Sequence, residues 1–421
     1  MQLLHNKLLI LTRAIILLPG IYILTLMWLI PEGEKYVPGL VALAFVSALP
    51  GSLSKHQHPQ IRANQRPFLI ALTSFTAYGL VTYFWKGDSW TTLRAFTAIT
   101  LYAWLLSGQT FRKVHVQLLL LISGICLVVI SAYQTTLGYD RLSGFINPIP
   151  FATALATLTL LIALITNSTS QRATKVIGAT LVMTLFVAIL LTQTRGVIVP
   201  IILIGMVGAT YKLITSKMNL TAKIIIALFV SLTVFLSVIT TVDKRIDHTL
   251  AEIQKIQSGD LSSSIGLRLQ MWSASVKLVA EKPVFGHGDL HKTALEKLKT
   301  KGKIDDSLSR YSPSHYHNQY LDSLVKQGVV GLALLLLMVA LGLRAAFLNP
   351  LAPKVWLPSV LVALVYASAS FSDVPLRHPN TIYLFILAIT ILSGLDSSAP
   401  DSTKHLKRKR QKHQYLENEH D

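Results

Sequence analysis

The residues best suited to chemistry gather in one short segment, S-P-S-H-Y-H-N-Q-Y-L-D, at positions 312–322. A histidine with an ordinary pKa of about 6.5 can accept a proton near neutral pH, so His317 is a candidate general base. His315, two residues earlier, could share a metal ion with it, and His287 and His291 have i, i+4 spacing. No nearby cysteine or carboxylate obviously completes a zinc site, so we expect no metal.

Three arginines are candidates for binding an anionic group. Arg195 stands in L-L-T-Q-T-R-G-V-I-V-P, between two apolar runs with almost no loop. A charge so close to a bilayer is costly unless it is paired, and a guanidinium can bind two phosphate oxygens at once. The alternative is a side chain that snorkels to the interface. Arg268 can equally be a solvated helix-surface residue, and Arg141 can simply pair with Asp140.

The composition indicates what kind of protein must position these side chains. Hydrophobic residues make up 52% of the 421 residues and charged residues 14%, whereas a soluble domain carries about 25% charged residues. The apolar residues form continuous runs of about 20, long enough to cross a bilayer core of about 30 Å. We therefore expect an all-α, polytopic integral membrane protein, since an outer-membrane barrel would show alternation instead.

The apolar runs predict about twelve transmembrane helices. We divide the chain into residues 1–242 with helices 1–9, a large helical outer loop at 243–325 that carries the reactive segment, residues 326–395 with helices 10–12, and a basic tail at 396–421. The runs fall at 8–30, 37–53, 67–84, 91–107, 114–133, 149–166, 173–193, 197–215, 222–242, 326–347, 353–372 and 378–395.

Positive charge predicts the orientation of these helices. With both termini inside, every second loop is basic, as the positive-inside rule requires. The inner loops hold Lys55, Arg62, Arg66, Arg112, Lys113, Arg172, Lys175, Lys212, Lys217, Lys223, Arg344 and Lys354. These loops and the tail, which would lie near anionic lipid headgroups, explain most of the net charge of +19 without nucleic acid. No acidic residue falls in mid-membrane, which disfavours an ion-coupled transporter.

The long outer loop predicts two helices. From Ile265 to Glu281, apolar residues recur every three or four positions and define one face, namely Leu267, Met271, Ala274 and Leu278. Pro283 and the G-H-G at 286–288 end this helix, and residues 289–302 form a second, basic one. A further helix is expected to start near His317 and to enter the apolar run at 326–347 without a break.

Three motifs resemble the O-antigen ligase family, glycosyltransferases of the Gram-negative inner membrane. They are L-T-Q-T-R-G at 191–196, S-I-G-L-R-L-Q-M-W with K-P-V-F-G-H-G within 264–288, and H-Y-H-N-Q-Y-L-D-S-L-V-K-Q-G-V-V-G-L at 315–332. The His-Asn and Arg-x-x-x-Trp elements are shared with O-antigen polymerases and protein O-oligosaccharyltransferases. The segments D-R-L-S at 140–143 and F-S-D-V-P-L-R at 371–377 look closer to ligases. The family layout, with a large periplasmic loop between the ninth and tenth of twelve helices, is the same.

The resemblance implies a GT-C-like transferase that moves a polysaccharide from undecaprenyl diphosphate to a sugar of lipid A–core, at the periplasmic face, without metal, nucleotide or other cofactor. The essential arginines of the family match Arg195 and Arg268, and its essential histidine matches His317. The arginines would stabilise the departing diphosphate. The histidine would deprotonate the acceptor in one inverting displacement. The absence of a carboxylate pair argues against double displacement.

Several residues are weaker candidates for binding substrate or orienting the base. They are Arg141, His315, Asn318, Gln270, Lys86 and Arg377, with Asp373 beside the last of these. The close alternatives in function are an O-antigen polymerase and a protein O-oligosaccharyltransferase. A lipid-linked sugar flippase or transporter is a more distant alternative.

Overall fold

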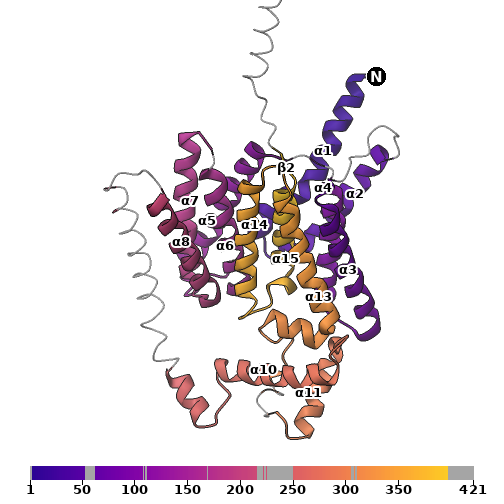
Figure 1. Cartoon of the computed structure of the whole chain (residues 1–421), viewed down its shortest axis with the longest axis vertical. Coiled ribbons are helices and arrows are strands. Elements are labelled where there is room, and N and C mark those ends of the chain that lie inside the picture. Colours follow the sequence, from indigo (N-terminus) through magenta and orange to yellow (C-terminus); the bar gives the residue numbers. More distant parts are fainter. Residues whose placement is uncertain are drawn as a thin grey trace, which may run out of the picture.

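The computed structural model describes residues 2–52, 62–107, 109, 111–167, 169–215, 221, 224, 250–304, 308 and 311–396. These residues form a bundle of α-helices, and α10 (Ser264–Glu281) and α11 (His291–Thr300) lie across one end (Figure 1). The bundle consists of α1 (Gln2–Leu24), α2 (Val37–Ser52), α3 (Arg66–Lys86), α4 (Trp90–Ser107), α5 (Lys113–Thr136), α6 (Pro148–Asn167), α7 (Arg172–Leu191), α8 (Arg195–Thr215), α13 (Gln319–Phe347), α14 (Ala352–Ala369) and α15 (Pro379–Ser393).

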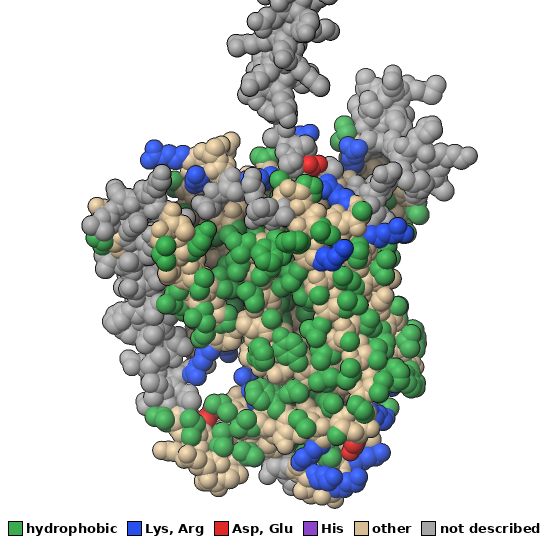
Figure 2. Space-filling view, viewed as in Figure 1, with side chains coloured by type: hydrophobic (Ala, Val, Ile, Leu, Met, Phe, Trp, Pro, Cys, Tyr) green, Lys and Arg blue, Asp and Glu red, His purple; other side chains and the backbone are tan. Residues whose placement is uncertain are grey.

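The bundle helices have the length and composition of membrane spans. Among the described residues, six are long and apolar enough to cross a bilayer, and three shorter apolar helices accompany them. Eleven of the twelve predicted runs coincide with α1–α8 and α13–α15, while of the run at 222–242 only Ile224 is described. Hydrophobic side chains cover the middle of the bundle in Figure 2, with most Lys and Arg side chains above and below. The protein is therefore an all-α, polytopic membrane protein, as predicted.

Two helices form the centre of the bundle. Every residue of α15 from Asn380 to Ser393 is buried, and so is 83% of the stretch Pro148–Thr166 in α6. Hydroxyl groups are tolerated there because they donate to carbonyls one turn back, as Thr157 does to Thr153 at 2.7 Å. A loop attached to such a buried helix is held in place, and residues 370–378 form the loop that leads into α15.

Loops predicted to lie outside the membrane on the same side meet at the end that carries α10. Gly87, after α3, accepts a hydrogen bond from the backbone of Asp289 at 3.0 Å. The hydroxyl of Thr92, in α4, donates to the carbonyl of Arg377 at 3.1 Å. The alternation of the predicted loops is therefore consistent with the packing of the helices.

The basic loops meet at the opposite end of the bundle. Two residues of β1 (Phe111–Arg112) pair in parallel with β2 (Leu395–Asp396), a ladder that the sequence did not predict. Arg62 lies 3.9 Å from Asp396. These contacts tie the segment after α15 to the loops before α3 and α5.

Helix α13 is broken at Gly328, so the prediction of an uninterrupted helix is wrong. Gly328 has φ 67° and ψ −170°, far from helical values. The loop after α10 fills the break, because Val329 donates to the carbonyl of Pro283 at 2.8 Å and Val330 to that of Val284 at 3.2 Å. A Cβ on Gly328 would lie 2.2 Å from the carbonyl oxygen of Val284, so only glycine fits this approach.

The helices across the end have their own small core. The predicted apolar face of α10 is buried, with Met271, Ala274 and Leu278 at most 1% exposed. This face packs with α11, Tyr316 and Val325 in a cluster separate from that of the bundle. The prediction of two helices in this loop is confirmed, and the first begins where the Ser263 hydroxyl accepts from the backbone of Gly266 at 3.1 Å.

Candidate active site

Three histidines and one aspartate meet where two loops adjoin at the end that carries α10. His315 and His317 precede α13, and Asp373 and His378 lie between α14 and α15. His317 Nδ1 is 3.4 Å from Asp373 Oδ1, and His315 Nε2 is 3.5 Å from the same oxygen. His378 Nε2 is 3.5 Å from Asp373 Oδ2. The expectation that no carboxylate stands near His315 and His317 is therefore wrong.

Asp373 is the centre of this cluster. Its side chain is 3% exposed. Burial alone would raise its pKa, but the rings of His315, His317 and His378, which face the carboxylate at 3.4–3.5 Å, hold the pKa of the Asp373 carboxyl well below its usual range. Asp373 therefore stays ionised and presents a fixed negative charge to the three rings.

His317 is held in an unusual backbone conformation. Its φ is 47°, in the left-handed region that residues other than glycine rarely adopt. Such geometry is found where surrounding contacts impose it, often at functional sites. The next residue, Asn318, supplies one such contact, because its side-chain oxygen caps α13 by accepting from the backbone of Tyr320 at 3.0 Å and Leu321 at 3.1 Å. Asn318 is a predicted substrate ligand, and this cap favours a positioning role.

Tyr316 anchors the segment between the two histidines. Its carbonyl accepts a hydrogen bond from Trp272 Nε1 at 3.1 Å. Its hydroxyl lies 3.0 Å from His291 Nδ1, and burial raises the pKa of Tyr316. His287 Nε2 lies 2.9 Å from the carbonyl oxygen of Leu278. His287 and His291 therefore have separate structural partners and do not share a site.

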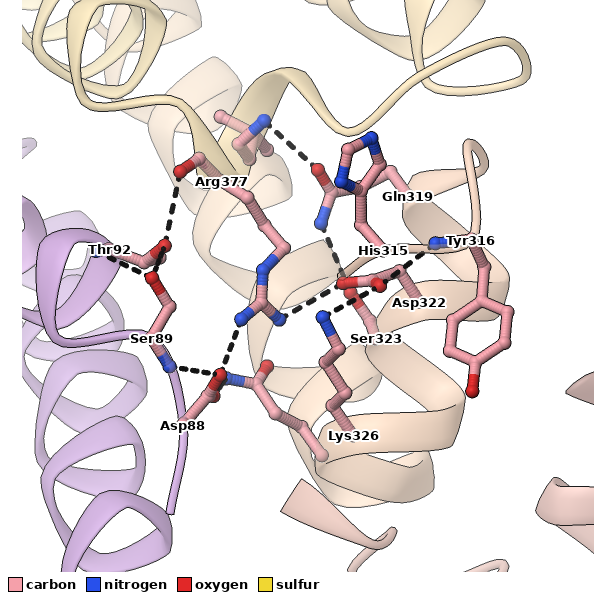
Figure 3. Close-up of polar contacts among 12 residues, drawn as sticks. Asp88, Ser89, Thr92, His315, Tyr316, Gln319, Asp322, Ser323, Lys326 and Arg377 are labelled. Atoms are coloured by element: carbon pink, nitrogen blue, oxygen red, sulfur yellow. Dashed lines mark hydrogen bonds and ion pairs between the residues drawn. The ribbon is translucent and has the colours of Figure 1, made fainter. Parts of the chain in front are cut away.

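A buried ion cluster lies beside the histidines (Figure 3). The guanidinium of Arg377 donates to Asp88 and, at 3.0 Å, to Asp322. Lys326 Nζ lies 3.1 Å from Asp322 Oδ1 and donates to the carbonyl of Ser314 at 2.5 Å. The cluster holds two cations and two anions, so its charges offset one another inside a region of low dielectric.

Arg377 belongs to this cluster more closely than to a substrate. Burial disfavours its charge, but Asp88 and Asp322 reverse that effect and raise the pKa of Arg377 above its ordinary value. Burial likewise would raise the pKa of Asp88, and Arg377 overrides it so that the pKa is lowered. The sequence predicts Arg377 as a substrate ligand, but its guanidinium is already bound to the carboxylates of Asp88 and Asp322. The arrangement favours a role in holding the loop that carries Asp373.

Arg195 is the first residue of α8. It is exposed and makes no hydrogen bond or ion pair with the residues that the structure describes. The next residue, Gly196, packs against Ser372, because a Cβ on Gly196 would lie 2.1 Å from Ser372 Oγ. Ser372 directly precedes Asp373, so the amino-terminal end of α8 adjoins the loop that contacts His317.

Arg141 supports the turn in front of Arg195. Its Nε donates to the carbonyl of Thr192 at 2.6 Å, and its Nη2 to the hydroxyl of Thr194 at 3.2 Å. Gln193, between them, has φ 53° and donates to the carbonyl of Asp140 at 2.9 Å. These contacts connect the predicted residue Arg141 to the placement of Arg195.

Arg268 lies in α10, the helix across the end. It is half-buried and has no ion pair among the described residues. It lies one helical turn before Trp272, which donates to the residue between His315 and His317. Gln270, in the same helix, is buried and donates to the carbonyl of Leu261 at 3.1 Å.

Lys86, a predicted substrate ligand, holds the loop that follows α10. Its ammonium donates to the carbonyls of Phe285 at 3.0 Å and Gly286 at 2.9 Å, and lies 4.0 Å from the centre of the Trp85 ring. These contacts attach the end of α3 to the loop docked at Gly328.

Four residues that contact the site in the structure were not among the residues predicted from the sequence, namely Asp88, Asp322, Lys326 and His378. Asp322 and Lys326 carry a visible signal, since opposite charges four residues apart face one another on a helix. Asp88 and His378 carry none, because their partners lie far away in the chain.

Two comparisons with known proteins bear on this geometry. Residues 179–336 match the family model of the O-antigen ligase domain, Wzy_C. A Haemophilus influenzae protein titled as uncharacterized is 27% identical over 198 residues, which are 45% of this chain and 47% of that protein. The match thus spans about half of each chain, and that title assigns no activity. The family match contains Arg195, Arg268, His315 and His317, so residues 179–336 are similar to the O-antigen ligase domain.

Proposed function

We propose that this protein is an O-antigen ligase, which transfers a polysaccharide from undecaprenyl diphosphate to a sugar hydroxyl of lipid A–core. The observation that carries the proposal is the environment of His317. Its Nδ1 faces the ionised Asp373 at 3.4 Å, while its Nε2 has no partner among the described residues. This leaves one nitrogen with a lone pair at the surface of the site.

The pair of His317 and Asp373 is suited to a general base. A carboxylate beside Nδ1 favours the tautomer with the proton on that nitrogen, so that Nε2 can accept. Nε2 takes the proton of the acceptor hydroxyl while its oxygen forms a bond to the anomeric carbon of the donor. The bond from that carbon to the diphosphate oxygen breaks, the electron pair leaves with the diphosphate, and the carbon is inverted.

Arg195 and Arg268 are suited to the leaving group. Neither is paired with a described carboxylate, whereas Arg377 is paired with two. An unpaired guanidinium can bind the oxygens of a diphosphate in a bidentate manner and stabilise the charge that develops there. The contacts through Gly196 and Trp272 support the placement of both arginines near His317.

The proposal includes the location of the site. We place the protein in the bacterial inner membrane with both termini in the cytoplasm and the end that carries α10 in the periplasm. The domain division at residues 242, 325 and 395 is part of this proposal. The basic loops that meet at the opposite end support it, because positive charge is retained on the cytoplasmic side.

Lipopolysaccharide gels from a strain lacking the gene test the proposed reaction. Loss of a ligase leaves bare lipid A–core while full-length undecaprenyl-linked polymer accumulates, and loss of a polymerase leaves core with one repeat unit. Complementation with His317→Ala, Arg195→Ala or Arg268→Ala should keep the bare-core pattern at normal protein abundance. Removal of a general base costs about 10²–10⁴-fold in rate. Parental ladders from His317→Ala, or core with one repeat unit, would contradict the proposal.

A further inference from the structure

Two separations around Asp373 are close to those between the ligands of a metal ion. Zn²⁺ binds histidine nitrogen and carboxylate oxygen at about 2.0–2.1 Å in a tetrahedron, and the edges of such a tetrahedron are about 3.3–3.4 Å long. Asp373 Oδ1 lies 3.4 Å from His317 Nδ1 and 3.5 Å from His315 Nε2. The three ligand atoms all lie within 4.8 Å of one another. We propose that His315, His317 and Asp373 form a Zn²⁺ site that inhibits the protein.

The atoms that face this position have no satisfactory partner. His317 Nδ1 and Asp373 Oδ1 are buried and make no hydrogen bond of normal geometry within the described residues. Separations of 3.4 and 3.5 Å exceed the usual 2.7–3.2 Å for nitrogen and oxygen. Asp373 is 2% exposed, so water does not solvate its carboxylate freely. A cation between the three atoms would satisfy all of them at once.

The residues around the three ligands orient them as in known zinc sites. A histidine that binds a metal through one nitrogen generally uses the other to contact a fixed polar group. His315 Nδ1 lies 3.0 Å from the hydroxyl of Ser314, which directs Nε2 toward Asp373. His378 Nε2 lies 3.5 Å from Asp373 Oδ2, the oxygen that does not face His315 and His317. Both contacts leave the three inner atoms free to bind.

The donor set selects the class of metal. Two imidazoles and one carboxylate match three-ligand zinc centres, whose fourth position is open to water. Mg²⁺ and Ca²⁺ prefer oxygen ligands throughout. We therefore expect Zn²⁺ to bind, and Mg²⁺ to have no effect.

Zn²⁺ bound at this site prevents His317 from acting as the general base, an inference that rests on the proposed function. With Zn²⁺ on His317 Nδ1, the neutral imidazole carries its proton on Nε2, the nitrogen that has to accept a proton from the acceptor hydroxyl. The ion also takes up the carboxylate oxygen of Asp373 that faces His317 at 3.4 Å. Zinc binding and transfer therefore exclude one another.

Direct binding of Zn²⁺ to the full chain tests the site without reference to activity. The protein is purified in nanodiscs through a tag that contains no histidine, stripped of metal and titrated with Zn²⁺. We expect one ion per chain. Loss of an outer-shell partner already costs about 10–100-fold in affinity, so His315→Ala, His317→Ala and Asp373→Asn should each weaken binding more than about 100-fold. His115→Ala and Asp260→Asn, at exposed positions away from the cluster, are the matched controls.

The transfer assay with lipid-linked donor and lipid A–core tests the inhibition. Transfer should fall by half at the Zn²⁺ concentration that half-fills the site, and chelator should restore it. Zinc binding that survives all three substitutions, or full transfer by loaded protein, overturns the proposal. If the variants fail to fold, Co²⁺-loaded wild-type protein provides a second test. It should show the visible absorption bands of a tetrahedral site, and their absence overturns the proposal. Protein that binds zinc through these residues but transfers nothing supports the site and overturns the proposed function.

Discussion

In the proposed mechanism, the reactivity of His317 depends on the carboxylate of Asp373, which faces it. Asp373 approaches His317 Nδ1 from a loop 56 positions further along the chain. We expect Asp373→Asn to lower kcat by about 10²-fold or more, because a general base contributes about 10²–10⁴-fold and its tautomer would no longer be fixed. The KM values should change little, since Asp373 does not contact a substrate in the proposed mechanism. Steady-state transfer assays separate the two constants.

A matched control keeps this prediction specific. Asp260→Asn removes an exposed carboxylate from the same end of the molecule and should leave both constants unchanged. If Asp373→Asn raises KM for the acceptor with kcat intact, Asp373 binds substrate and does not orient the base.

The residues that the sequence could identify are those that stand out within a single segment. His317 and His315 lie in a polar stretch of an apolar chain, and Arg195 interrupts two apolar runs. Asp88 and Arg377 pair across 289 positions, so neither carries a local sign of the other. Their roles depend on how the helices assemble, which no short pattern records.

At the scale of elements, the break in α13 is the joint between the bundle and the helices across its end. We expect Gly328→Ala to displace the loop after α10, because its Cβ would lie 2.2 Å from the carbonyl oxygen of Val284. A left-handed conformation alone costs a non-glycine residue about 1–3 kcal/mol, and the clash adds to it. Hydrogen exchange should show faster exchange in residues 264–300, together with loss of transfer.

Gly138→Ala separates strain from the clash. Gly138 has φ +75°, close to the φ of +67° at Gly328, but nothing lies within 4 Å of a Cβ there. It should therefore show the cost of backbone conformation alone. Equal effects of the two substitutions on residues 264–300 would show that the break in α13 does not hold this layer.

His291 makes the helices across the end sensitive to acid. Burial, and then the positive charge of Lys326, lower the pKa of His291 to about 3. An unfolded histidine takes up a proton near pH 6.5, so the unfolded state binds more protons below that pH. Stability should therefore be constant above about pH 6.5 and fall by up to about 1.4 kcal/mol per pH unit as the pH drops toward 3.

Substitution of His291 tests this sign. His291→Gln should flatten the acid slope of the unfolding free energy, measured by tryptophan fluorescence between pH 7.5 and 5, whereas His115→Gln should not. An unchanged slope would mean that another group, such as His287, dominates. Burial also lowers the pKa of His287, with the same sign.

Apolar period and length predicted the elements well, because a bilayer requires continuous apolar helices. The face of α10 followed from residues three and four apart. The break at Gly328 did not, because a glycine inside a helical pattern shows its purpose only when Val284 and Pro283 are placed beside it. The ladder of β1 and β2 is two residues long in each strand and leaves no pattern to read.

At the scale of the whole molecule, different groups of residues lie at the two ends of the bundle. The histidines and the ion cluster lie at one end, while the opposite end holds basic loops and the ladder of β1 and β2. Because all the described spans between them run from end to end, one measured loop fixes the side of the others. The proposed orientation can therefore be tested with two positions.

Single cysteines report this orientation. In a Cys126→Ala background, Ser262→Cys at the end that carries α10 should react with a membrane-impermeant maleimide in cells whose outer membrane is permeable. Gln171→Cys at the opposite end should react only after lysis. Both positions are exposed, so accessibility within the protein does not limit labelling. The reverse pattern would place the site in the cytoplasm and contradict the proposed function.

The loop before α15 also determines when, during synthesis of the chain, the proposed site is completed. Asp373, Arg377 and His378 are translated after α1–α14. Until residues 373–378 leave the ribosome, Asp88 and Asp322 lack the guanidinium they share, and His317 lacks its carboxylate. A nascent chain that has inserted only α1–α13 therefore holds the histidine without its activating partner. If the proposed mechanism holds, membrane insertion of α14 and α15 therefore completes the site in a single biosynthetic step.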